Sequence, residues 1–469
     1  MKRAAALCLL LAAPAAAQDL EPKLRGALVR LQATSQGYDA REPWKTSGIS
    51  NRGGRGVVIA PGTVLTLAAN VRDHRMITLS VANSSRQYEA RLKHVDYRVG
   101  LAQVEILDEE LKARMSPLEI GDPVRLDDEF DVYQLGQDNM VERSTARVVR
   151  ADAGTSRLSL RLKTTLSDGG NGQVALRDGK IAGLISATNA RRQEGTLLSV
   201  ETIRRYLDDF ADGKYDGLPG GGIWWQPLLR DDLRAFHGLG DDRHGIAVTR
   251  VVPGRTGDGV LRAGDVITEV DGYALDDEGK FTHETHGRLS AAYLFQGRRY
   301  AGGTIPVKVL RDGKELELEV TLKAWPRPEQ RVPQKAVDRR PRFLVVGGLV
   351  ILELDRSSAS GVVLRRYRAR SSWDPPGERR RIVFVDHVLD DPTNKGFESL
   401  NRALIETVNG RPINEIKDVA AALEQPQGRF HVLRFEGVNS DFVIEASKLA
   451  EIDRRVAKTY GVTLLRHLD

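Results

Sequence analysis

Cysteine is almost absent from this sequence, and its absence excludes several kinds of chemistry. The single cysteine, Cys8, lies in an N-terminal segment that we expect to be removed, and Leu7 before it is too large for a lipid-attachment site. We therefore expect the mature chain to contain no disulfide and no thiol nucleophile. Apolar runs long enough to span a bilayer are missing as well. The fold must then depend on its hydrophobic cores.

An excess of one charge sign is also missing. The 70 Lys and Arg residues stand against 64 Asp and Glu residues, and the two signs are mixed along the chain. We interpret the net charge of +6 as a solvated surface, and no nucleic-acid-binding motif is present. With 469 residues, 41% of them apolar, the sequence is typical of a globular protein with about three domains.

The first 17 residues have the pattern of a secretory signal. Lys2 and Arg3 precede an apolar stretch at residues 4–11, and three alanines at residues 15–17 come before Gln18. A charged start, a short apolar stretch and small residues at a cleavage point are typical of signal peptides. We expect residues 1–17 to be removed and the protein to be exported, either to the periplasm or to the medium.

Short strand patterns with turn signals dominate residues 24–207. Examples are residues 56–59, 63–66, 76–81, 158–162 and 181–185. This spacing predicts a mainly β sandwich or barrel, and a helical pattern follows at residues 200–210. Glycine and proline are concentrated at residues 216–222, and prolines recur at residues 324–342, so we place domain boundaries at both stretches.

The two segments beyond residue 220 contain similar short motifs. Residues 266–272 read VITEVDG and residues 404–410 read LIETVNG. Both are alternating strands that end in a dipeptide typical of tight hairpin turns. The repeat favours a small β-rich domain that occurs twice.

A longer match around the first of these motifs resembles bacterial-type PDZ domains. It comprises residues 261–272 (LRAGDVITEVDG), with strand signals at residues 245–254 and 306–314. A strand-rich body followed by two such domains resembles the HtrA/Deg serine-protease family, and residues 342–350 and 385–391 resemble the divergent second domain of plant-type members. The resemblance implies a trypsin-like double β-barrel at residues 18–215 and PDZ-type α+β domains at residues 220–324 and 342–469. Residues 325–341 would then be a linker.

The catalytic triad implied by this resemblance is degenerate. A serine protease needs a serine activated by a histidine that an aspartate orients. The positions that match the family motifs hold Ala69 for the histidine, Gly100 for the aspartate and Asn171 for the serine. A one-residue shift would offer Asn70 or Gly172 instead, and neither restores the chemistry. The loop that builds the oxyanion hole is also altered, so we expect no catalytic residues and an inactive enzyme.

Neither a displaced hydrolase site nor a metal site is expected. A displaced hydrolase site would use Ser167 with one of the nearby polar residues, but the required geometry would not survive such a shift. Those residues are His74, His94, Asp73 and Asp96. His283 and His286 would share one face of a helix, but no further metal ligand is in view. We therefore expect no metal and no cofactor.

The resemblance implies a peptide-binding groove in the first PDZ domain. A carboxylate-binding loop would lie at Gly221 and Gly222, followed by an edge strand from Ile223. Trp224 and Trp225 on that strand would be either a peptide anchor or core residues. A helix near residues 288–295 would line the groove with Leu289, Ala292 and Tyr293.

These observations favour an exported pseudoprotease that serves as a peptide-binding scaffold or chaperone-like regulator. Its expected partners are peptide or unfolded-protein segments, and the family resemblance implies a homo-oligomer such as a trimer. The alternative is an HtrA/Deg-type serine endopeptidase in protein quality control with a rearranged active site. A structural envelope component would be a third possibility.

Overall fold

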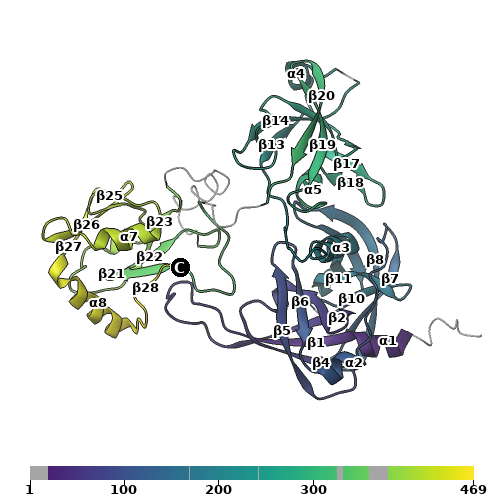
Figure 1. Ribbon diagram of the computed structural model, residues 1–469, viewed down its shortest axis with the longest axis horizontal. Helices are drawn as coiled ribbons and strands as arrows, with labels where there is room; N and C mark the ends of the chain where they lie inside the picture. Colours follow the sequence, from purple (N-terminus) through teal and green to yellow (C-terminus); the bar gives the residue numbers. More distant parts are fainter. Residues whose placement is uncertain (1–19, 168, 241, 325–330, 359–378) are drawn as a thin grey trace, which may run out of the picture.

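The computed structural model describes residues 20–167, 169–240, 242–324, 331–358 and 379–469. The expected signal peptide lies outside these residues. Within them, a mainly β chain forms two barrels, a middle domain stacked on the barrels, and a C-terminal domain to one side (Figure 1). None of the described helices has both the length and the apolar character needed to cross a membrane.

The first barrel is a closed sheet in the order β1-β2-β3-β6-β5-β4. β5 alternates buried and more exposed residues, whereas β3 is buried along its whole length. The helix α1 (Leu20–Ala27) leads into β1 (Leu28–Ser35), β2 (Ser50–Ala60), β3 (Thr63–Leu67), β4 (His74–Val81), β5 (Gln87–Asp96) and β6 (Leu101–Ile106). Between β1 and β2 a long loop leaves the barrel toward the C-terminal domain (Figure 1).

The second barrel closes in the order β10-β11-β12-β9-β8-β7. Its strands are β7 (Glu129–Leu135), β8 (Val141–Ala153), β9 (Leu158–Thr164), β10 (Val174–Arg177), β11 (Lys180–Asn189) and β12 (Glu194–Ser199). The helix α3 (Val200–Asp208) follows, and the Ser199 side chain caps it by accepting from the Thr202 N–H. The predicted double barrel and the helix after it are confirmed.

The middle domain is a sheet in the order β13-β14-β15-β19-β20, with β16 paired to β15. Its strands are β13 (Ile223–Pro227), β14 (Ile246–Val251), β15 (Val266–Val270), β16 (Tyr273–Ala274), β19 (Thr304–Arg311) and β20 (Lys314–Thr321). The predicted helix at residues 288–295 is present only in its second half. Residues 280–290 form the hairpin β17 (Lys280–His283) and β18 (Gly287–Ser290), and only α5 (Ala292–Gln296) is helical.

The C-terminal domain consists of two four-stranded sheets. One contains β21 (Phe343–Val346), β22 (Leu349–Glu353), β23 (Val383–Val388) and β28 (Arg466–His467). The other contains β24 (Ile405–Val408), β25 (Arg411–Pro412), β26 (Phe430–Phe435) and β27 (Phe442–Glu445). The helices α7 (Ile416–Leu423) and α8 (Ala446–Tyr460) contribute to a shared apolar core. Val332, inside the predicted linker, is fully buried in that core.

The repeated motif forms the same hairpin in both places. Asp271 and Gly272 have φ of 51° and 81°, and Asn409 and Gly410 have φ of 52° and 77°. Two successive residues with positive φ make the tight turn that connects twisted antiparallel strands. The predicted hairpins are therefore present at β15–β16 and at β24–β25.

Candidate functional site

The loop that carries Asn171 connects β9 to β10 and rests on β2. The Arg55 N–H donates to the Asn171 carbonyl at 2.8 Å, and the Asn171 side chain reaches the Gly53 carbonyl at 3.4 Å. Gly172 follows with φ of 103°, and a Cβ there would lie 2.4 Å from the Arg55 carbonyl oxygen. Glycine is therefore required at this position, both for its backbone conformation and for the close approach of β2.

Gln173 accepts a hydrogen bond from the Asn171 N–H, the backbone donor that a serine protease would offer to its substrate. Its side chain is fully buried, and its Oε1 accepts the Asn171 N–H at 3.0 Å. Its Nε2 donates to Gln134 Oε1 at 3.1 Å. In triad proteases the N–H of the nucleophile position stabilises the oxyanion. Here that N–H already has a partner, which a substrate oxygen would have to displace.

Asn70, rather than Ala69, points to this loop. The short 3₁₀ helix Ala68–Asn70 leaves Ala69 exposed and buries Asn70. Asn70 Nδ2 donates to the Asn171 carbonyl at 2.8 Å and to Thr66 Oγ1 at 2.9 Å. The ungapped match to the family motif puts Ala69 at the histidine position. A match shifted by one residue puts Asn70 there, and Asn70 is the residue that faces Asn171. An amide at this point can hold the loop but cannot take up a proton near neutral pH.

Gly100 lies in the turn before β6, where its carbonyl accepts the Ala68 N–H at 2.9 Å. Its φ is 88°, a conformation that residues with side chains rarely adopt. A Cβ at this position would lie 2.8 Å from Nη1 of Arg157. The space beside Gly100 is therefore filled by a guanidinium group from the second barrel.

The polar residues of the alternative hydrolase site have partners elsewhere. His94 Nδ1 contacts the Tyr206 hydroxyl at 3.0 Å, and Asp96 accepts the Tyr215 hydroxyl proton at 2.6 Å. His74 Nδ1 is 2.9 Å from the Val71 carbonyl oxygen. Asp73 bonds to Asp338 in the segment that leads into the C-terminal domain. These contacts give each of the four residues a structural role away from the Asn171 loop.

The predicted peptide-binding strand is an edge strand. β13 pairs with β14 on one side and is the last strand of the sheet on the other. Gly222 before it is buried, and a Cβ there would lie 2.5 Å from Arg255 Cβ. Trp224 is 45% exposed, whereas Trp225 is partly buried with its ring 6.3 Å from that of Phe295. The two tryptophans therefore have different surroundings.

The predicted groove lining is buried. Leu289 on β18 is 2% exposed and Tyr293 on α5 is 4% exposed, and both belong to the core of the middle domain. The nearest part of α5 to the glycine loop is Gln296, whose side chain lies 3.2 Å from a Cβ built on Gly221. A ligand on β13 would thus meet Trp225 and Gln296 before it reached Leu289 or Tyr293.

His283 and His286 are not on a helix, because they lie at the end of β17 and in the turn after it. His286 Nε2 contacts Glu201 Oε1 on α3 at 2.5 Å, so it joins the middle domain to the second barrel. Sequence reasoning missed this pair because 85 residues separate its members. In the described parts of the chain, no group of three His, Cys, Asp or Glu side chains is placed to hold a metal ion.

A cleft of about 640 Å³ separates the same two parts of the molecule. Its walls are β8 of the second barrel and the β17–β18 hairpin of the middle domain. Arg150 and Asp152 line one wall, and Lys280 and Arg288 line the other. His286, which contacts Glu201 on α3, also lines this cleft.

Three curated proteins illustrate what the whole chain is similar to. Protease Do-like 2, chloroplastic, of Arabidopsis thaliana is 25% identical over 468 residues, 94% of this chain and 75% of that protein. Protease Do-like 4, mitochondrial, of the same plant is 25% identical over 392 residues, 82% of this chain and 74% of that protein. A Marinomonas sp. (strain MWYL1) protein named "Probable periplasmic serine endoprotease DegP-like" is 24% identical over 283 residues, 56% of this chain and 55% of its own.

Two further comparisons concern the domains. A family model described as a PDZ domain matches residues 332–467, which begin inside the predicted linker and cover the C-terminal domain. The solved structure of a variant of the HtrA-type protease AlgW with a decapeptide has a TM-score of 0.52 and 16% identity. It covers 66% of this chain and 98% of its own, and at this identity the likeness shows a shared fold.

Proposed function

We propose that this chain, which belongs to the HtrA/Deg-like protease family with a trypsin-like domain and a PDZ domain, binds extended protein segments without cleaving them. The observation that carries the proposal is the Asn171 loop. At the position of the nucleophile this loop has an amide side chain, and its N–H is bonded to Gln173. The loop then lacks a nucleophile, and one N–H of the expected oxyanion hole already has a partner.

The other two triad positions support the same reading. Asn70 has no basic group, and Gly100 has no carboxylate to orient one. A serine mechanism needs all three groups, and their loss leaves at most the part of the rate that comes from substrate binding and the oxyanion hole. In this chain the Asn171 N–H, one of the expected oxyanion donors, is also bonded to Gln173.

The binding side of the proposal rests on β13. An extended segment can add to an unpaired strand edge through main-chain hydrogen bonds, and the glycine loop before it offers N–H groups to a terminal carboxylate. Pro227 has no N–H, so the usable edge ends before it. The AlgW structure contains a decapeptide, and we extend peptide binding to the middle domain of this chain.

We further propose that the protein is exported, that it forms a homo-oligomer and that it acts as a scaffold or chaperone-like regulator. The charged and apolar pattern of residues 1–17 supports export. The similarity to a DegP-like protein named as periplasmic is consistent with it. The alternative, an endopeptidase with a rearranged site, is favoured by the relatives named as proteases.

Degradation of reduced casein by the purified protein tests both functions. The wild type and a Ser167→Ala variant are incubated with the substrate, and the products are followed by gel and mass spectrometry. We expect no cleavage by either form, together with retention of casein by the immobilised wild type. Cleavage that Ser167→Ala abolishes would establish a rebuilt active site, and cleavage that the change leaves intact would indicate a contaminating protease.

A further inference from the structure

The loop between β1 and β2 forms a hairpin that reaches the C-terminal domain (Figure 1). The Asp39 N–H donates to the Lys45 carbonyl at 3.1 Å, and the Ser47 N–H donates to the Gly37 carbonyl at 2.9 Å. Asp39 Oδ1 also accepts the N–H groups of Arg41 and Glu42. These bonds preform residues 37–47, which we call the docking hairpin, and they present Pro43 and Trp44 at its tip.

Trp44 is buried in the core of another domain. It is 2% exposed, its ring lies 6.3 Å from that of Phe343, and its carbonyl accepts the Thr463 hydroxyl proton at 3.3 Å. Every other buried member of this core lies between Val332 and Val462. The indole Nε1 is buried without a hydrogen-bond partner, so the contact is made through apolar surface.

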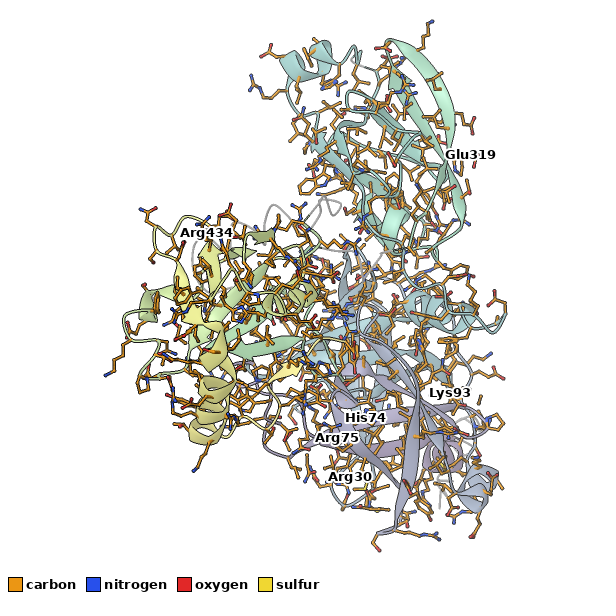
Figure 2. All side chains as sticks on the ribbon, turned by 60° about the vertical axis from the view of Figure 1, so that its left-hand side comes forward. Arg30, His74, Arg75, Lys93, Glu319 and Arg434 are labelled. Carbon is orange, nitrogen blue, oxygen red and sulfur yellow. The ribbon has the colours of Figure 1, made fainter. Side chains whose placement is uncertain are left out.

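Polar contacts accompany the tryptophan at the base of the docking hairpin. Tyr38 lies between two guanidinium groups, that of Arg75 on β4 at 5.8 Å and that of Arg340 at 4.9 Å. In Figure 2, Arg75 is labelled on the side of the first barrel that is next to the C-terminal domain. Asp73 and Asp338 exchange hydrogen bonds, each accepting the N–H of the other. Arg75 and Asp338 are exposed, whereas Tyr38, Asp73 and Arg340 are partly buried. Because the polar contacts are partly solvated, we expect them to orient the domain and Trp44 to hold it.

We propose that the C-terminal domain contains a binding site for an aromatic side chain presented on a β-hairpin, and that its occupant is Trp44 of the same chain. The PDZ family match covers residues 332–467 and does not include the docking hairpin. The hairpin therefore comes from outside the matched segment, as a ligand would. This proposal does not depend on peptide binding by β13.

When Trp44 occupies this site, it connects the C-terminal domain to the segments that position the Asn171 loop. The docking hairpin continues into β2, which starts at Ser50, and Arg55 of β2 holds the Asn171 carbonyl. Asp73, which contacts Asp338, follows closely on Asn70, whose side chain holds the same carbonyl. Both attachments of the domain thus lie next to segments that position the Asn171 loop.

Limited trypsin digestion of the full chain tests the proposal. Cleavage is followed after Lys335 and Arg339, which lie beside the contacts that attach the domain. We expect Trp44→Ala to accelerate this cleavage at least tenfold. Ile49→Ala is the matched control, because Ile49 ends the same loop and is 70% exposed, and it should leave the rate unchanged.

A synthetic peptide of residues 36–50 provides the second arm. Added to the Trp44→Ala chain, it should bind and return cleavage to within about twofold of the wild-type rate, while the peptide with Trp44→Ala should not. Hydrogen exchange of α8 reports whether the domain stays folded. If α8 loses protection in the variant, the wild-type peptide must restore it. Cleavage of the variant at the wild-type rate, or failure of the peptide to bind, would overturn the proposal.

Discussion

Gln173 shows, at the scale of a single residue, how the Asn171 loop is held in place. It links the Asn171 N–H on one side to the Gln134 side chain on the other, from a position with no solvent exposure. Its amide uses one donor and one acceptor, and it thereby connects the Asn171 loop to β7.

Replacing Gln173 by alanine should destabilise the second barrel. The change leaves the Asn171 N–H and the Gln134 Oε1 without this partner in a dry environment, and each buried unsatisfied group costs about 1–3 kcal/mol. Urea unfolding followed by hydrogen exchange of β10 and β11 should show a loss of at least that size. Gln87→Ala is the control, because Gln87 is exposed and should change stability by less than about 0.5 kcal/mol. An equal effect of the two changes would contradict the role given to Gln173.

The sequence offers candidates for the triad positions but does not show their surroundings. Asn171 and Gly100 stand out because short motifs flank them in both directions. The contacts of Gln173 and the approach of Arg157 to Gly100 join residues far apart in the chain, and no local pattern reports them. The choice between Ala69 and Asn70 likewise depended on which side chain the 3₁₀ turn directs inward.

At the scale of elements, β13 gives different surroundings to Trp224 and Trp225, which the sequence could not assign to a peptide anchor or to the core. Successive residues of a strand point to opposite faces, so adjacent tryptophans cannot serve the same surface. Trp225 packs toward Phe295 and the core of the middle domain, and Trp224 is 45% exposed. The helix predicted nearby begins only at Ala292, because a hairpin precedes it. The turn around Gly287, with φ of 70°, folds residues 280–290 into a hairpin.

Alanine at the two tryptophans should therefore have opposite consequences. Trp225→Ala should destabilise the middle domain by roughly 1–3 kcal/mol, because a large partly buried ring is lost. Trp224→Ala should leave stability within about 0.5 kcal/mol. It should weaken binding of reduced casein about tenfold if Trp224 anchors the ligand. Thermal unfolding and surface binding measure the two effects. A Trp224→Ala variant that binds casein as the wild type does would remove Trp224 from the binding surface.

Asp453 on α8 makes the stability of the C-terminal domain depend on pH. Burial raises the pKa of Asp453 to about 6, although the hydrogen bond from the Gly347 N–H at 2.7 Å opposes the rise. Because the unfolded chain has a carboxyl pKa near 3.9, the folded state binds the proton more tightly between about pH 4 and pH 6. The stability that Asp453 contributes is therefore complete below about pH 4 and is lost as the pH rises through 6.

The Asp453→Asn variant should remove this pH dependence. The amide oxygen can still accept the Gly347 N–H, and no charge is buried at any pH. We expect the variant to be more stable than the wild type at pH 7.5 by about 1–3 kcal/mol and to resemble it at pH 4.5. Denaturant unfolding followed by hydrogen exchange of α8 measures the difference. A variant less stable than the wild type at pH 7.5 would show that the carboxylate is favourable in the folded protein.

At the scale of the whole molecule, contacts between domains decide the arrangement. Trp44 joins the first barrel to the C-terminal domain, and Glu201 with His286 joins the second barrel to the middle domain. The domains themselves could be predicted, since each has its own strand pattern and turn signals. Their arrangement could not, because it depends on a few side chains whose partners lie more than 80 residues away.

Glu201 should fasten the middle domain to the second barrel through its charge. Burial pushes its pKa upward, but the hydrogen bond and charge of His286, with help from Ser199, outweigh burial and hold the pKa of Glu201 below its usual value. The stabilisation is present above about pH 4.3, where the unfolded carboxyl ionises, and it is lost as the pH falls through the lower folded pKa. Glu201→Gln should therefore loosen the hairpin already at pH 7, raising hydrogen exchange of β17 and β18 severalfold. Glu194→Gln, which breaks a surface ion pair with Lys163, should leave this exchange unchanged. If the two variants exchange alike, the charge of Glu201 does not hold the middle domain in place.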